Sequence, residues 1–177
     1  FDTASSSLNP NNRGYSFYVY GTLPIFIVRY VAGWLGQSGY DQVNVVGRVI
    51  SGIFDLGTIV MIYLIGKRMY RNSKLGFLAA LFLALSVLPI QLSHYFAVDT
   101  FTNFFVYSAL FIAICIADPG KPGGRTTDAN ATEKPKEKNW WFVNWIEFIP
   151  YGLFGLLYGM ALASKVSIYL LALALPI

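Results

Sequence analysis

The sequence predicts an all-α membrane protein, a polytopic bundle of transmembrane helices. Hydrophobic residues make up 55% of the 177 residues and charged residues only 12%, whereas a soluble domain carries about 25% charge. The apolar residues gather in runs of about 20, and a helix of that length crosses a hydrocarbon core of about 30 Å. Aromatic residues reach 17%, and several of them flank the runs as an interfacial belt does.

The chain is expected to be a fragment of one transmembrane domain. Residues 1–40 are predicted to form an outer loop and a short apolar helix in the interface, with a re-entrant segment as the alternative. Residues 118–139 lack apolar content, which predicts a mobile loop. The chain starts without a leading apolar run, so a further span is expected upstream of Phe1. About five spans are expected within the chain, at 43–66, 75–93, 97–117, 145–163 and 166–177.

Basic residues predict the orientation of these spans. Four of the 13 lie in the loop 66–74 and five in the loop 118–139, so the positive-inside rule makes both loops cytoplasmic. The other four lie at or toward the outer face, where topology alone does not explain them. They are Arg13, Arg29, Arg48 and Lys165, on the same side as Asp2, Asp41, His94 and Asp99.

Asp99 is the main candidate for chemistry, because it lies in a short polar link between two long apolar runs. A carboxylate at the outer end of a span can act as general base toward a hydroxyl, or bind a cation. The alternative is an N-cap for a helix that opens at Thr100. His94 could position a substrate, although a lone histidine near an interface is more often a hydrogen-bonded packing residue.

Two cations are candidates for phosphate binding. Arg48 suits an anionic headgroup or phosphate, since a guanidinium binds such groups bidentately; a polar contact with neighbouring helices is the alternative. Lys165 could neutralise a leaving phosphate or extend to the interface for solvation alone. Gly155 and Gly159 have the GxxxG spacing that lets helices approach closely.

Several classes of function find no support in the sequence. The chain has one cysteine and one histidine, which excludes an internal disulfide and a histidine-rich metal site. P-loop, GxGxxG, HExxH and CxxC motifs are absent. Nucleic-acid binding is excluded because the basic residues follow membrane topology. No cofactor is assigned, and a divalent cation stays open as a candidate with no residue named as its ligand.

Six motifs follow one another along the chain: NPNNRG at 9–14, FYVYGTLP at 17–24, GRVIS at 47–51, YLIGKRMY at 63–70, QLSHYFAVD at 91–99 and GMALASK at 159–165. As an ordered set they resemble the bacterial family 39 glycosyltransferases. These are relatives of the protein O-mannosyltransferases and of the lipid A aminoarabinose transferase. The resemblance covers nearly the whole chain except the loop 118–139.

The resemblance implies a GT-C fold in the bacterial inner membrane, with the active site on the outer face. Such enzymes transfer a sugar from a polyprenyl-phosphate carrier and invert its anomeric centre. It implies that Asp99 is a secondary acidic residue that places the acceptor or a cation. Lys165 and Arg48 would bind the carrier phosphate, and Arg13 would belong to the outer-loop wall. The family's principal acidic motif is missing here; Asp2 is isolated, and the main acid is expected upstream.

Two further functions compete with an enzyme. A non-catalytic accessory subunit of a larger respiratory or photosynthetic membrane complex would use the glycine-lined fourth span and the exposed aromatic residues for helix docking. A transporter has less support, because the sequence has no matching pair of broken helices in two halves.

Overall fold

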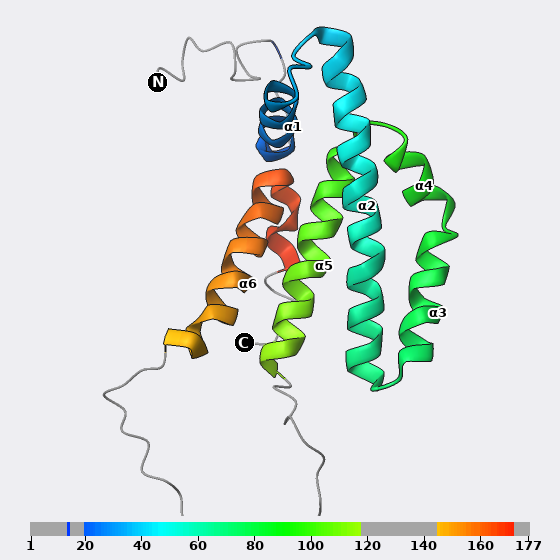
Figure 1. The fold of residues 1–177 in the computed structure, drawn as a ribbon. Helices are drawn as coiled ribbons and strands as arrows, with labels where there is room; N and C mark the ends of the chain where they lie inside the picture. The colour runs from blue at the N-terminus through cyan, green and yellow to red at the C-terminus, as the bar shows by residue number, and fades with distance from the viewer. Residues whose placement is uncertain (1–13, 15–19, 118–144, 172–177) are drawn as a thin grey trace, which may run out of the picture.

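The computed structural model describes residue 14 and residues 20–117 and 145–171. Every regular element in these residues is a helix, which confirms the all-α prediction (Figure 1). The elements are α1 (Leu23–Trp34), α2 (Tyr40–Tyr70), α3 (Ser73–Ala84), α4 (Val87–Ser93), α5 (Val98–Ala117), α6 (Trp145–Ser164) and the 3-10 helix η2 (Val166–Leu170).

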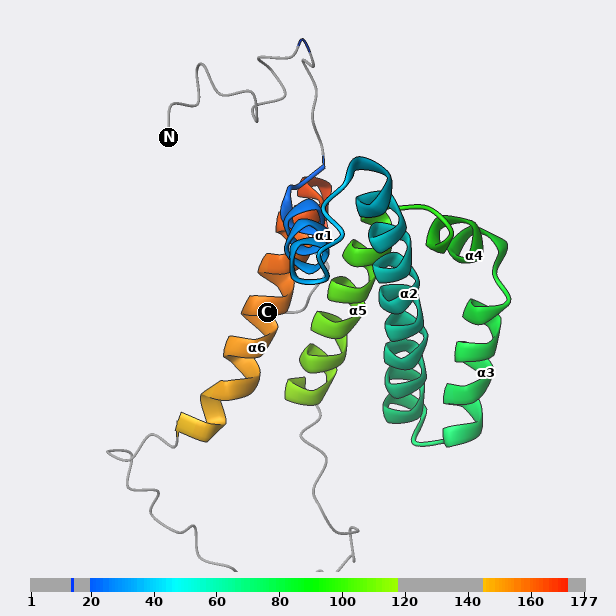
Figure 2. The ribbon, with the colours of Figure 1, turned by 45° about the horizontal axis from the view of Figure 1, so that its top comes forward.

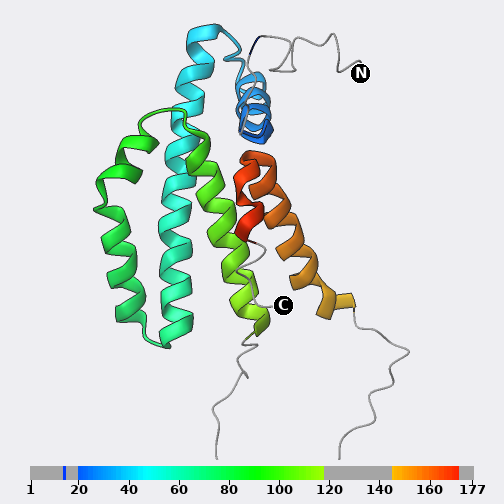
Figure 3. The ribbon, with the colours of Figure 1, turned by 180° about the vertical axis from the view of Figure 1, so that it is seen from behind.

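Two helices are long and apolar enough to cross a membrane. They are α2, over Asp41–Tyr70, and the whole of α5. With 31 residues, α2 is about 46 Å long, so its ends extend beyond a hydrocarbon core of about 30 Å. The helix packs along α3 on one side and α5 on the other, and α5 packs along α6 (Figures 1 and 3). The chain is therefore a helical membrane protein.

The span expected at 75–93 is divided into two helices. α3 and α4 are bent by 62° at the break between them, so the pair is a broken span or a re-entrant loop. Pro89 explains the break, because its ring lacks an N–H and clashes with the carbonyl four residues earlier, at Leu85. At the break, Ser86 Oγ donates to the carbonyl oxygen of Phe82, in the last turn of α3, over 2.8 Å. If this pair counts as one span, the described residues hold three spans.

The described residues show neither of the last two expected spans, although α6 covers the residues 145–163 expected for the first of them. The apolar part of α6 covers Phe148–Ser164, which falls short of the length of a span. The chain then turns back, and η2 lies beside α6, where Tyr158 Oη donates to the carbonyl oxygen of Ile168 over 3.3 Å (Figure 3). Residues 166–170 form a 3-10 helix, and the structure describes the span expected at 166–177 only as far as residue 171, which is α-helical. Residues 172–177 and the loop 118–139 lie outside the described residues.

A single hydrophobic core joins α1, α2, α5 and α6 at one end of the bundle. The ring of Phe101 is fully buried, and its centroid lies 4.5 Å from that of Phe54. Because close packing leaves side chains little room to shift, this core fixes the position of the start of α5. Its buried members are Val28, Ala32, Val46, Ile50, Phe101, Phe105 and Ala161.

The interfacial segment forms α1, which lies across this same end of the bundle (Figure 2). Pro24, Val28 and Ala32 are its buried residues, and they recur every four positions on one helix face. Tyr30 and Phe26 are exposed. We call this end, where α5 begins and α6 ends, the α1 end; the opposite end, where α2 turns into α3, is the basic end.

The glycines that bring helices together differ from those predicted. The GxxxG pair Gly155 and Gly159 meets nothing within 4 Å of an added Cβ among the described residues, so it makes no close approach there. The tight contact is instead between α2 and α3, where a Cβ on Gly66 would lie 3.0 Å from Gly76 Cα. Spacing within one helix cannot tell which face meets a neighbour, and among the described residues no helix approaches the GxxxG pair.

Candidate functional site

An ion pair between α5 and the end of α6 forms the centre of the candidate site. Lys165 Nζ donates to Asp99 Oδ1 over 2.7 Å, across 66 residues of sequence. The side chains of Lys165 and Asp99 are 29% and 35% exposed, so solvent reaches both. A charge-assisted bond of this length is strong in itself, but exposed pairs add only about 0.2–1 kcal/mol to stability. The contribution of this ion pair to folding stability is therefore too small to explain by itself why the two charged residues are paired here.

The backbone around Lys165 holds its ammonium toward Asp99. Lys165 has an extended conformation, with φ −152° and ψ 117°, and it pairs with Tyr20 in an isolated antiparallel β-bridge. Gly21 N donates to the carbonyl oxygen of Ser164 over 2.8 Å. The segment before α1 is thereby bonded to the segment after α6, and Lys165 lies where the two meet.

Tyr20 adds an aromatic face to the pair. Lys165 Nζ lies 5.7 Å from the centroid of the Tyr20 ring, within the range of a cation–π contact. The ammonium is thus near both a carboxylate and an aromatic ring. Tyr20 was assigned no role from the sequence. The available signal was its place before Gly21 in the FYVYGTLP motif, directly ahead of a helix that begins with a proline in its first turn.

Gly21 is the position that permits this close approach. An added Cβ there would lie 1.7 Å from the carbonyl oxygen of Ala163, which no side chain could tolerate. Ser164, the next residue, is fully buried, and its Oγ donates to the carbonyl oxygen of Met160 over 2.9 Å. The end of α6 is therefore packed against backbone, with no room for adjustment.

Asp99 does not cap α5, contrary to the structural alternative considered from the sequence. The helix begins at Val98, so Asp99 lies inside its first turn. A carboxylate there is favourable for the helix dipole, yet its bond is to Lys165. Thr100, expected as the first helical residue, is also inside the helix, and its Oγ1 donates to the carbonyl oxygen of Ala97 over 2.8 Å.

Arg48 lies at the α1 end but makes no ion pair with any described residue. Its neighbour Gly47 faces Phe96, since a Cβ on Gly47 would lie 2.9 Å from Phe96 Cγ. Arg48 therefore lies at the level of the chain just before Asp99, with an exposed side chain. The structure brings Asp99 and Lys165 together and leaves Arg48 at the same end without contact to them.

His94 is bonded within its own segment. Its Nδ1 lies 2.6 Å from the carbonyl oxygen of Ile90, and because a carbonyl only accepts, Nδ1 carries the proton and donates. This is the hydrogen-bonded role that a lone histidine was expected to have, although the side chain is exposed. Asp2 and Arg13, the two remaining candidates, lie outside the described residues.

Metal binding gains no support from the described residues. Among residues 20–117 and 145–171, no three His, Cys, Asp or Glu side chains are grouped as a metal site requires. Within that part of the chain Asp99 has Lys165, not a second carboxylate, as its charged partner. The arrangement is therefore suited to an anion or a hydroxyl, which an ammonium and a carboxylate can bind.

Protein-family models, curated proteins and solved structures were all compared with this chain, and none of them matches it. The likeness to family 39 glycosyltransferases consequently stays a prediction that depends on the six motifs. The function must be argued from the site itself.

Proposed function

We propose that this chain belongs to a bacterial inner-membrane glycosyltransferase that moves a sugar from a polyprenyl-phosphate carrier to an acceptor on the outer face. The observation that carries the proposal is the pairing of Lys165 with Asp99 at 2.7 Å, partly exposed, at one end of a membrane bundle. The two groups come from motifs at 91–99 and 159–165, which resemble that family.

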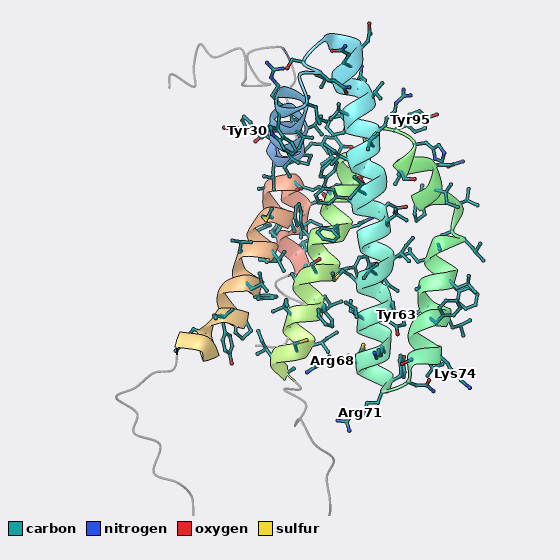
Figure 4. All side chains as sticks on the ribbon, in the orientation of Figure 1. Tyr30, Tyr63, Arg68, Arg71, Lys74 and Tyr95 are labelled. Atoms are coloured by element: carbon teal, nitrogen blue, oxygen red, sulfur yellow. The ribbon has the colours of Figure 1, made fainter. Side chains whose placement is uncertain are left out.

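The distribution of charge supports the proposed sidedness. Arg48 and Lys67 are separated by 19 helical positions of α2, or about 28 Å, close to the thickness of a hydrocarbon core. Arg68, Arg71 and Lys74 lie at the basic end, away from Tyr30 and Tyr95 at the α1 end (Figure 4). With the basic end cytoplasmic, the proposed site faces outward, where lipid-linked donors are used.

In the proposed reaction, an acceptor hydroxyl oxygen forms a bond to the anomeric carbon of the sugar. The bond from that carbon to the carrier phosphate breaks, and the phosphate leaves with the electron pair. Lys165 would meet the growing negative charge of this phosphate. Asp99 would orient the acceptor and accept its proton, and its attraction for Lys165 keeps the ammonium in place before the donor binds.

The first test separates binding from transfer. The full chain, reconstituted in proteoliposomes, is expected to bind polyprenyl phosphate. Lys165→Gln should weaken this binding by roughly 10- to 150-fold, because a charge-assisted bond to phosphate contributes about 1.5–3 kcal/mol. Radiolabelled donor then reports whether sugar leaves the carrier. Equal affinity of Lys165→Gln and the unchanged chain for polyprenyl phosphate would contradict the proposal.

A non-catalytic accessory subunit is the second candidate, favoured by one observation. Gly152, Gly155 and Gly159 meet nothing within 4 Å of an added Cβ among the described residues, and the large side chains Leu153 and Leu156 on the same helix are exposed. Such a face suits helix docking. Gly155→Leu is expected to release an accessory subunit from its complex, as judged by size in mild detergent, while leaving an independent transferase active.

A further inference from the structure

The turn between α2 and α3 concentrates positive charge at one end of the bundle. We call Lys67, Arg68, Arg71 and Lys74 the basic turn. The sequence from 56 to 98, which includes it, has no Asp or Glu. Arg71 and Lys74 extend outward from the end of the helical hairpin (Figure 4).

The backbone of the basic turn is held in one conformation. Arg71 ends α2 in the left-handed region, with φ 50°, and Asn72 Oδ1 accepts from Lys74 N over 2.9 Å at the start of α3. A Cβ on Gly76 would lie 2.8 Å from Lys67 N. This contact places Lys67 beside the first turn of α3, so the lysines of the two helices lie at one level.

Helix electrostatics account for only part of the cluster. Lys67 and Arg68 lie in the last turn of α2, where cations are favourable for the helix dipole. Lys74 is the second residue of α3, where a cation opposes the dipole. The exposed ammonium of Lys74 and the N-terminus of α3 therefore both favour an anion at the turn.

The surroundings of the basic turn are apolar. Met69, Tyr70 and Phe77 are large, exposed hydrophobic residues, and Tyr63 lies under the Lys67 ammonium at 5.9 Å from its ring centroid. Apolar and aromatic side chains next to several cations match the boundary between acyl chains and headgroups. A water-soluble anion would gain nothing from these apolar neighbours.

We propose that the basic turn is a binding site for the headgroup phosphate of an anionic phospholipid. Lys67 and Lys74 would bind the phosphate from the two helices, while Met69, Tyr70 and Phe77 contact the acyl chains. Basic groups at the cytoplasmic surface of a span recognise such lipids. The site lies at the opposite end from Asp99 and Lys165, so it does not depend on the proposed transfer reaction.

The test uses the full chain in neutral detergent, titrated with phosphatidylglycerol or phosphatidylcholine. Bound lipid is counted by native mass spectrometry, and the thermal unfolding midpoint is recorded. We expect phosphatidylglycerol to bind and to raise the midpoint, and phosphatidylcholine to do neither. Lys67→Gln with Lys74→Gln should weaken phosphatidylglycerol binding by roughly 20- to 30-fold, since each cation near an anionic surface contributes about fivefold.

Matched controls distinguish a site from general charge. Lys134→Gln with Lys138→Gln removes the same charge from the loop 118–139 and should leave the affinity unchanged, and Lys67→Arg with Lys74→Arg should retain it. An equal loss in both glutamine pairs would overturn the proposal, as would an equal midpoint shift with glycerol phosphate. Unchanged binding after Lys165→Gln is expected here, whatever that variant does to polyprenyl phosphate.

Discussion

Asp99→Asn is expected to lower the rate of sugar transfer by about 10²–10⁴-fold, the contribution typical of a positioned acid or base. Asparagine keeps the size of the side chain, and its amide oxygen can still accept from Lys165 Nζ. In the unchanged protein this nitrogen lies 2.7 Å from Asp99 Oδ1. The amide cannot take a proton from an acceptor hydroxyl, however. The structure should survive the change because the ion pair is partly exposed and such pairs add only about 0.2–1 kcal/mol.

Rates with saturating donor, together with the thermal unfolding midpoint, check this prediction. Asp41→Asn is the matched control, because Asp41 is an exposed carboxylate in the first turn of α2 at the same end of the bundle. It should keep the full transfer rate. If Asp99→Asn lowered the unfolding midpoint enough for unfolding to account for its lost activity, the carboxylate would have a structural role alone. A transfer rate equal to that of Asp41→Asn would likewise exclude a role in transfer.

Among the glycines that the structure describes, Gly21 is expected to show the largest loss of stability on substitution by alanine. The new Cβ would lie 1.7 Å from the carbonyl oxygen of Ala163 and 2.4 Å from its carbonyl carbon, and backbone atoms cannot rotate away. The two segments joined by the β-bridge must separate, which removes the bond from Gly21 N to Ser164 O. We expect a cost of about 3 kcal/mol or more in the free energy of unfolding, at the upper end for overpacking.

The same variant should also reduce any function of Lys165, because the bridge from Tyr20 holds the backbone of Lys165. Gly33→Ala is the matched control: Gly33 lies in α1 and meets nothing within 4 Å of an added Cβ. There alanine should be neutral or stabilising by up to about 1 kcal/mol, since it is the better helix former. Similar unfolding midpoints for the two variants in detergent would contradict the close approach at Gly21.

The spanning helices could be predicted from the sequence, because they depend on local properties. The expected span 43–66 lies within α2, and the expected span 97–117 begins one residue before α5 and ends with it. Both helices have spanning length, since hydropathy and helical rise are sums along the chain. The bend at Leu85 was missed, although Pro89 gave a local signal for it. The apolar residues of the run 75–93 predicted one continuous span, and that prediction took no account of the missing N–H of Pro89.

The sequence by itself determined that the chain is an apolar helical membrane protein and that its basic residues gather in a few loops. Only the tertiary structure decided that Asp99 meets Lys165 while Arg48 and His94 do not. It also decided that Gly21 and Gly76, not Gly155 and Gly159, lie against backbone. Contacts of this kind depend on how each helix is rotated and shifted against its neighbours, and hydropathy, which is summed along a single helix, contains no information about either.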